Sequence, residues 1–142
     1  MTRIDFHSNV PDKVAYACRL VRKARNAANC QIVILAKDAQ QMAALDEALW
    51  IFSEQDFLPH VKLEDPLAAQ TPILLTTDDK MEAPHHQILI NLSDAPPGHF
   101  ARFERMFEIV SSDETDKSSG RERYRYYQQR GYPLTHFTAD AP

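Results

Sequence analysis

Two cations and an aromatic residue near the end of the sequence are spaced as they would be in a binding site. Lys117, Arg121 and Tyr124 stand at positions i, i+4 and i+7, which places them on one stripe of a helix. Val110 precedes this segment and Gly131 follows it, so that both could complete a small pocket. Arginine pairs with a carboxylate in a bidentate geometry, and an apolar slot accepts a terminal side chain. The pattern suits capture of another protein's C-terminus; the alternative is a solvated basic helix with inward tyrosines.

The sequence lacks the motifs of common enzyme sites. Its first glycine is Gly98, and residues 6–11 match neither the dinucleotide-binding fingerprint nor a P-loop. The histidines lack metalloprotease spacing, and His85-His86, in a polar loop, is interpreted as two solvated imidazoles. No G-x-S-x-G motif or Cys-His context indicates a nucleophile. We therefore expect no catalytic residue, no metal site and no cofactor.

The composition of the chain favours a soluble cytoplasmic protein. The chain has 142 residues, 44% hydrophobic and 25% charged, which predicts one domain over residues 1–142. The longest apolar run, residues 32–36, is far shorter than the roughly 20 residues of a membrane helix. The charged first five residues lack a secretory apolar stretch. Cys18 and Cys30 are too few for a disulfide framework, so we interpret them as small buried or partly buried thiols.

The charge distribution bears on nucleic acid. A net charge of −4 argues against a protein that mainly follows a phosphate backbone, so we expect any contact with DNA to be indirect. Local basic patches on an acidic chain suit acidic peptides. Direct binding of single strands through the first helix would need stacking aromatic residues, which its basic residues lack nearby in the sequence. The two basic groups are Arg19, Arg22, Lys23 and Arg25, and Arg121, Arg123, Arg125 and Arg130.

Elements that would position these residues follow from the hydrophobic pattern. Val14, Cys18 and Val21 predict a helix over residues 12–28, which Asp12 can cap. Residues 32–36 form an apolar run without alternation, as in a strand covered on both faces. A second helix is expected over 38–50 and a first strand at 4–7, which together make a βαβ pattern. The fold class is α/β, a three-layer domain with a mostly parallel sheet.

The second half of the chain has less regular patterns. Extended segments are expected at 57–61, 73–76 and 88–92, with loops at 64–70 and 77–86. Residues 96–110 fit either a helix or a strand, and we favour a short helix followed by a strand at 107–110. The last helix ends at Arg130, because Gly131 is a natural residue beyond a helix end and Pro133 blocks continuation.

The start of the last helix has two solutions. Ser111 with Glu114, and Ser119 with Glu122, both fit a capping box, so the helix begins near 112 or near 120. A late start would leave Lys117 in a loop.

Four segments resemble those of the chi subunit family of DNA polymerase III. The resemblance covers nearly the full length, in the family's order and at similar separations, and the first segment is the most specific. It implies a Rossmann-like fold that has lost nucleotide binding, in a non-catalytic accessory subunit of the clamp-loader assembly. The segments are Leu45-Asp46-Glu47-Ala48-Leu49-Trp50, Phe57-Leu58-Pro59-His60, Arg121-Glu122-Arg123-Tyr124 and Gly131-Tyr132.

The resemblance also implies two protein partners. Chi pairs with the psi subunit, which links it to the rest of the clamp loader, and binds the acidic C-terminal tail of single-stranded DNA-binding protein, which ends in phenylalanine. The tail pocket falls on Val110, Lys117, Arg121, Tyr124 and Gly131.

For psi we expect Trp50, Phe57 and Leu58, because aromatic residues often anchor interfaces. The alternative is that Trp50, the only tryptophan, is a core residue. The runner-up function is a degenerate α/β enzyme that binds a nucleotide or phosphate, which would require an anion-binding turn.

Overall fold

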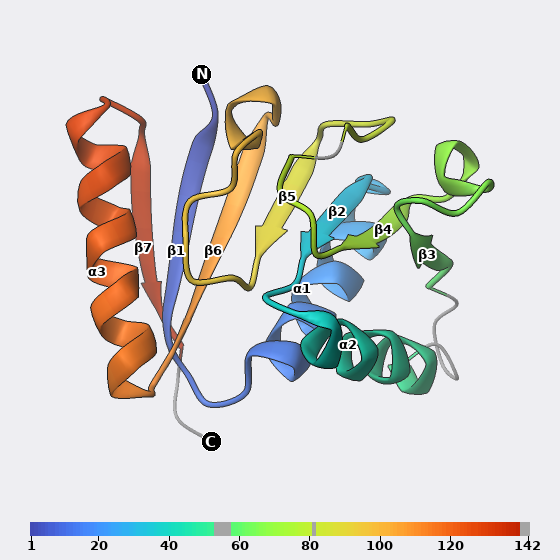
Figure 1. The fold of residues 1–142 in the computed structure, drawn as a ribbon, viewed down its shortest axis with the longest axis horizontal. Coiled ribbons are helices and arrows are strands. Elements are labelled where there is room, and N and C mark those ends of the chain that lie inside the picture. The colour runs from blue at the N-terminus through green and yellow to red at the C-terminus, as the bar shows by residue number, and fades with distance from the viewer. Residues whose placement is uncertain (53–57, 81, 140–142) are drawn as a thin grey trace.

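A computed structural model describes residues 1–52, 58–80 and 82–139 (Figure 1). Within these ranges seven strands form one sheet in the order β3-β4-β2-β5-β6-β1-β7, and each neighbouring pair is parallel. The elements are β1 (Arg3–Val10), α1 (Lys13–Ala28), β2 (Ile32–Leu35), α2 (Ala39–Phe52), β3 (His60–Lys62), η1 (Ala68–Gln70), β4 (Ile73–Thr76), β5 (Ile88–Asn91), η2 (Phe100–Arg102), β6 (Arg105–Ser111), α3 (Glu114–Gln129) and β7 (Leu134–Thr138).

The interior strand β2 is apolar at every position because both of its faces are covered. Ile32 and Ile34 belong to the core cluster shared with α1 and α2, whereas Val33 and Leu35 belong to the cluster on the opposite face. Side chains alternate between the faces of a strand, so a run without polar residues requires helices or loops on both sides. The three-layer α/β prediction is confirmed, with α1 and α2 on one face and α3 on the other (Figure 1).

The starts of the helices are set by side-chain caps. The carboxylate of Asp12 accepts a hydrogen bond from the Ala15 N–H at 3.2 Å, which confirms the predicted cap of α1. Asp38 accepts from the Gln41 N–H at 2.8 Å at the start of α2. None of the helices in the described ranges combines the length and apolarity needed to cross a membrane.

In the second half of the chain the structure confirms one expectation and corrects another. The predicted short helix followed by a strand at 107–110 is confirmed, because residues 100–102 form the 3₁₀ helix η2 and β6 follows from Arg105. The sequence pattern does not indicate β7, whose residues are mostly exposed because it lies at the sheet edge. The interpretation of His85 as a solvated imidazole is wrong. Its side chain is buried, and its Nε2 lies 3.3 Å from the Thr71 carbonyl oxygen.

Candidate peptide-binding pocket on helix α3

Helix α3 starts early enough to include Lys117. Its first residue is Glu114, and the Asp113 carboxylate caps it by accepting from the Asp116 N–H at 3.2 Å. Ser111 is therefore not the capping residue. Its own N–H donates instead to the Asp116 carboxylate at 2.6 Å. Lys117 lies in the first turn of α3, which decides between the two starts that the sequence allowed.

A buried polar network fixes how α3 is rotated against the sheet. Glu108 on β6 accepts hydrogen bonds from Arg123 Nε at 3.0 Å and from the Tyr127 hydroxyl at 2.5 Å. Asn91 on β5 donates to the same carboxylate at 2.9 Å. Burial raises the pKa of Glu108, while Arg123 and the hydrogen bonds of Tyr127 and Asn91 oppose this rise. The expectation that Arg123 belongs to a basic surface patch is wrong, because this guanidinium lies in the core.

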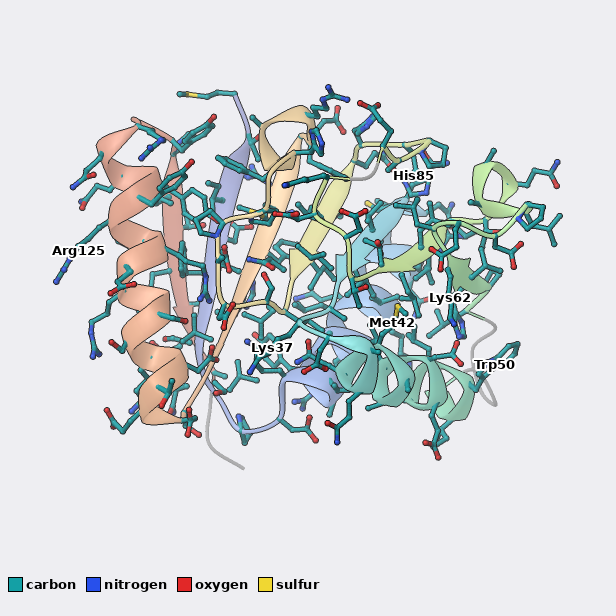
Figure 2. All side chains as sticks on the ribbon, viewed as in Figure 1. Lys37, Met42, Trp50, Lys62, His85 and Arg125 are labelled. Carbon is teal, nitrogen blue, oxygen red and sulfur yellow. The ribbon has the colours of Figure 1, made fainter. Side chains whose placement is uncertain are left out.

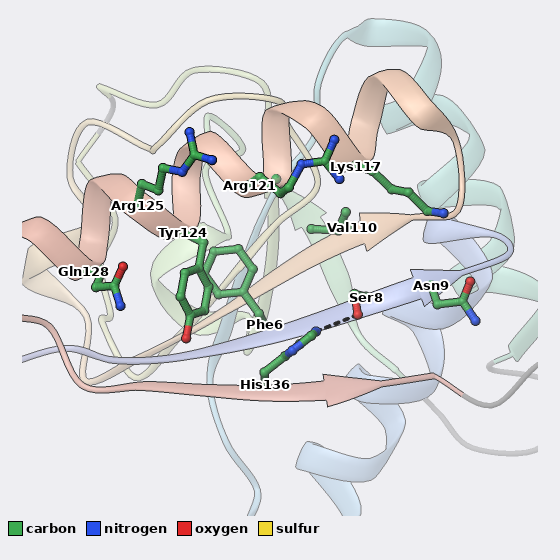
Figure 3. A pocket seen from close by; sticks show the side chains of 11 residues that line it. Phe6, Ser8, Asn9, Val110, Lys117, Arg121, Tyr124, Arg125, Gln128 and His136 are labelled. Carbon is green, nitrogen blue, oxygen red and sulfur yellow. Dashed lines mark hydrogen bonds between the residues drawn. The ribbon is translucent and has the colours of Figure 1, made fainter.

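Because the Arg123 side chain points into the core, the neighbouring row of residues on α3 faces an open pocket. The pocket has a volume of about 650 Å³, within the range of ligand sites. Figure 3 shows it between α3 and the strands β1, β6 and β7. Its walls are Phe6, Ser8, Asn9, Val110, Lys117, Gly120, Arg121, Tyr124, Arg125, Gln128 and His136.

The floor of the pocket is apolar and closely packed. Phe6 lies edge-on to Tyr124, with ring centroids 5.1 Å apart. A Cβ atom on Gly120 would stand 2.8 Å from the Val110 Cγ2, so glycine is what allows α3 to approach β6 this closely. This contact explains a glycine in a helix interior, where it costs about 1 kcal/mol relative to alanine.

The rim of the pocket is cationic. Lys117, Arg121 and Arg125 follow one another at intervals of four along α3, and Figure 3 shows them on the same side of the pocket. Lys117 Nζ also lies 3.7 Å from the Glu114 carboxylate. Opposite them, His136 Nε2 is 2.6 Å from the Ser8 hydroxyl. Cations above an apolar floor can hold a carboxylate and an apolar group together.

Four of the five tail-pocket residues expected from the sequence lie together here. Val110, Lys117, Arg121 and Tyr124 line the pocket, but Gly131 does not. With φ of +78°, Gly131 instead makes the turn that follows α3. The sequence did not indicate the pocket residues that come from β1 and β7. The alternation of apolar and polar residues along 4–7 offered a signal for Phe6. His136 could not be placed because β7 was not predicted.

The expected psi residues are placed differently from one another. Trp50 is 56% exposed at the end of α2, so the alternative that it is a core residue is wrong (Figure 2). Its indole contacts the His60 ring, with centroids 4.9 Å apart. Leu58 is only 2% exposed, so its side chain is a core residue and does not face a partner. Phe57 lies outside the described residues.

The carboxyl edge of the strands, where α/β proteins commonly bind phosphates, is acidic. A cavity of about 240 Å³ there contains Lys13 and Lys37, together with Asp94, Asp113 and Asp116. Lys13 Nζ already pairs with the Asp116 carboxylate at 3.2 Å. Because aspartates cap the helix starts, the N–H groups that would hold a phosphate are directed to the chain's own carboxylates. Among the described residues no group of three or more His, Cys, Asp or Glu could hold a metal ion.

Comparison with known proteins identifies relatives over most of the chain. Residues 1–135 match the family model described as DNA polymerase III chi subunit, HolC. The DNA polymerase III subunit chi of Pseudomonas aeruginosa is 32% identical over 138 residues, which cover 94% of each chain. The subunit of that name from Escherichia coli is 27% identical over 104 residues, 73% of this chain and 71% of that one. The DNA polymerase III subunit chi of Haemophilus influenzae is 27% identical over 105 residues, which cover 74% of this chain and 73% of that one.

Proposed function

Because this chain belongs to the DNA polymerase III chi subunit family, we propose that it joins the clamp loader through psi and binds the acidic tail of single-stranded DNA-binding protein. In this role it is an accessory subunit without catalysis of its own, and it works in the cytoplasm as one domain. It contacts DNA through the tail of the bound protein. The single observation that carries the proposal is the pocket on α3, with its cationic rim and apolar floor.

The chemistry of the pocket fits a tail that is acidic and ends in phenylalanine. The terminal ring enters the slot formed by Phe6, Val110 and Tyr124, because aromatic surfaces prefer edge and stacked contacts with other rings. Arg121 stands beside this slot, where its guanidinium can pair with the terminal carboxylate. The acidic residues before the terminus then lie along the row of cations on α3.

Affinity for such a short peptide is expected near micromolar, about −8 kcal/mol. A charged hydrogen bond contributes about 1.5–3 kcal/mol, so Arg121→Ala should weaken binding roughly tenfold to 150-fold. Peptide binding by the parent chain should also weaken as salt is raised, because the ion pairs are exposed.

The second partner surface consists of Trp50 and Ile51 at the end of α2. They are 56% and 61% exposed, so the last turn of α2 presents two consecutive large apolar side chains to solvent. Contiguous exposed apolar residues mark interaction sites, and tryptophan is the residue most enriched at interface centres. We assign this surface to psi, with the buried Leu58 as a core residue rather than a contact.

A crossed experiment tests both assignments. Calorimetric titration with a peptide of the tail, and co-purification with psi, are carried out on Arg121→Ala and Trp50→Ala. Arg121→Ala should lose only the peptide, and Trp50→Ala should lose only psi. Arg130→Ala is the matched charge control, since Arg130 follows the same helix but stands outside the pocket, over the Tyr126 ring. Unchanged peptide affinity in Arg121→Ala would refute the pocket, and psi binding by folded Trp50→Ala would refute the second surface.

A further inference from the structure

The sheet face opposite α3 carries a second cavity, of about 420 Å³, between α1 and the strands β1, β6 and β7. Adjacent residues of the same strands line the two sites. Ser8 and His136 line the pocket under α3, whereas His7 and Phe137 line the second cavity. This division follows from the alternation of side chains along a strand. The second cavity is therefore separate from the proposed tail site.

Aromatic rings from three strands and α1 meet in this cavity. The His7 ring is stacked on Phe137, with centroids 5.2 Å apart and an angle of 24° between the planes. Phe107 meets His7 edge-on at 5.5 Å, and the Tyr16 hydroxyl lies 2.6 Å from His7 Nδ1. Phe137 is 49% exposed, so its ring extends the stack and still offers surface to a ligand.

The histidine in this stack acts as an uncharged ring. Burial lowers the pKa of His7, and the charges of Arg105 and Lys23 lower it further against the opposing effect of Asp5. At neutral pH the imidazole is therefore a neutral part of the aromatic wall. It supports Phe137 from behind without adding charge.

Cations surround the aromatic wall. Lys23 from α1 and Arg105 from β6 both line the cavity. Arg19 lies over the Tyr16 ring, 5.5 Å from its centroid. Arg105 pairs with the buried Asp5 carboxylate at 2.6 Å, so one of the three positive charges is offset. The mouth of the cavity keeps a net positive charge in a protein whose total charge is −4.

We propose that this cavity binds a nucleotide unit of single-stranded nucleic acid, with the base stacked on Phe137 and a phosphate held by Lys23 and Arg105. Aromatic platforms beside cations are the common means of binding single strands. A base must leave a duplex to enter a cavity, so paired strands do not fit. The expectation that the basic residues of α1 lack nearby aromatic rings is wrong, because Tyr16 of α1 lies under Arg19 and β1, β6 and β7 supply further rings. The proposal is independent of the tail pocket.

Fluorescence anisotropy with a labelled 20-nucleotide oligothymidylate tests the proposal on the full chain at low salt. Phe137→Leu keeps an apolar side chain but removes the ring, and should weaken binding about five- to 150-fold, the equivalent of roughly 1–3 kcal/mol per stacked base. Two phosphate contacts, from Lys23 and Arg105, predict a slope of about −1.4 for log K against log salt. Lys23→Ala, an exposed helix position, should reduce that slope by about 0.7.

Two comparisons distinguish this site from the tail pocket and from a general attraction to phosphate. Arg121→Ala should bind the oligomer like the parent chain, so that failure of the tail proposal leaves this result unaffected. The matched duplex and inorganic phosphate are expected to bind more weakly than the single strand. The proposal is overturned if the oligomer does not bind, if the duplex or inorganic phosphate binds as tightly, or if Phe137→Leu and Lys23→Ala, folded by circular dichroism, bind it unchanged.

Discussion

Replacing Arg123 with methionine should lower the free energy of unfolding by about 3–5 kcal/mol. Arg123 and Glu108 are 1% and 0% exposed, and Nε lies 3.0 Å from the carboxylate, so the substitution leaves a charge in the core without its partner. A methionine side chain fills much of the same volume, which limits the contribution of a cavity. Arg125→Met is the matched control, because Arg125 is exposed on the same helix and should change stability by less than about 0.5 kcal/mol.

The electrostatic origin of this loss makes it dependent on pH. Burial already raises the pKa of Glu108, and removal of the Arg123 charge raises it further. A raised folded-state pKa gives stability that is present below the unfolded pKa and is lost as pH rises through the folded pKa. The folded-state pKa of Glu108 is higher in the variant than in the parent chain. As pH rises, the variant therefore continues to lose stability at pH values where the parent chain no longer does. The difference between them should therefore be larger at pH 8 than at pH 5.

A double variant separates charge from packing. Glu108→Leu combined with Arg123→Met removes both charges and leaves mainly the Tyr127 hydroxyl without its acceptor, at about 1–3 kcal/mol. The double variant should thus be more stable than Arg123→Met alone. Urea unfolding followed by circular dichroism at the two pH values measures all four proteins. Equal destabilisation at pH 5 and pH 8, with no recovery in the double variant, would refute the reasoning.

Two further predictions concern the contacts of α3. In Gly120→Ala, overpacking against Val110 should destabilise the fold by about 1–3 kcal/mol, of which about 1 kcal/mol is offset by the higher helix propensity of alanine. Displacement of Val110 should also weaken tail binding. Thermal melting and peptide titration measure the two effects, with the exposed Ser118→Ala as the control. Although burial raises the pKa of Asp116, a backbone hydrogen bond and Lys13 outweigh it and hold this pKa below its usual value. The stability gained in this way is present above the unfolded-state pKa and is lost as pH falls through the folded-state pKa. In Asp116→Asn, the free energy of unfolding should therefore fall less steeply with decreasing pH below about pH 4 than in the parent chain.

The elements that the sequence predicts are those whose apolar residues either repeat at helical spacing or form an uninterrupted run. Val14, Cys18 and Val21 repeat at helical spacing, and α1 follows within one residue of the expected range. The apolar run of β2 needs cover on both faces, and so it implies the layers. β7 escapes prediction because an exposed edge strand such as Leu134–Thr138 keeps polar residues on both faces. Without β7, neither His136 nor Phe137 could be assigned to a site.

The arginines of α3 show that basic residues close together in the sequence need not form one basic surface. Arg121, Arg123 and Arg125 look equivalent in the sequence, but a helix turns by about 100° per residue, so the middle one faces away from the other two. Arg123 and Tyr127 enter the core and bond to Glu108, while Arg121 and Arg125 line the pocket. The buried network and the pocket are thus neighbouring stripes of one helix. Because the network fixes the rotation of α3, loss of Arg123 should weaken tail binding even though that side chain does not line the pocket.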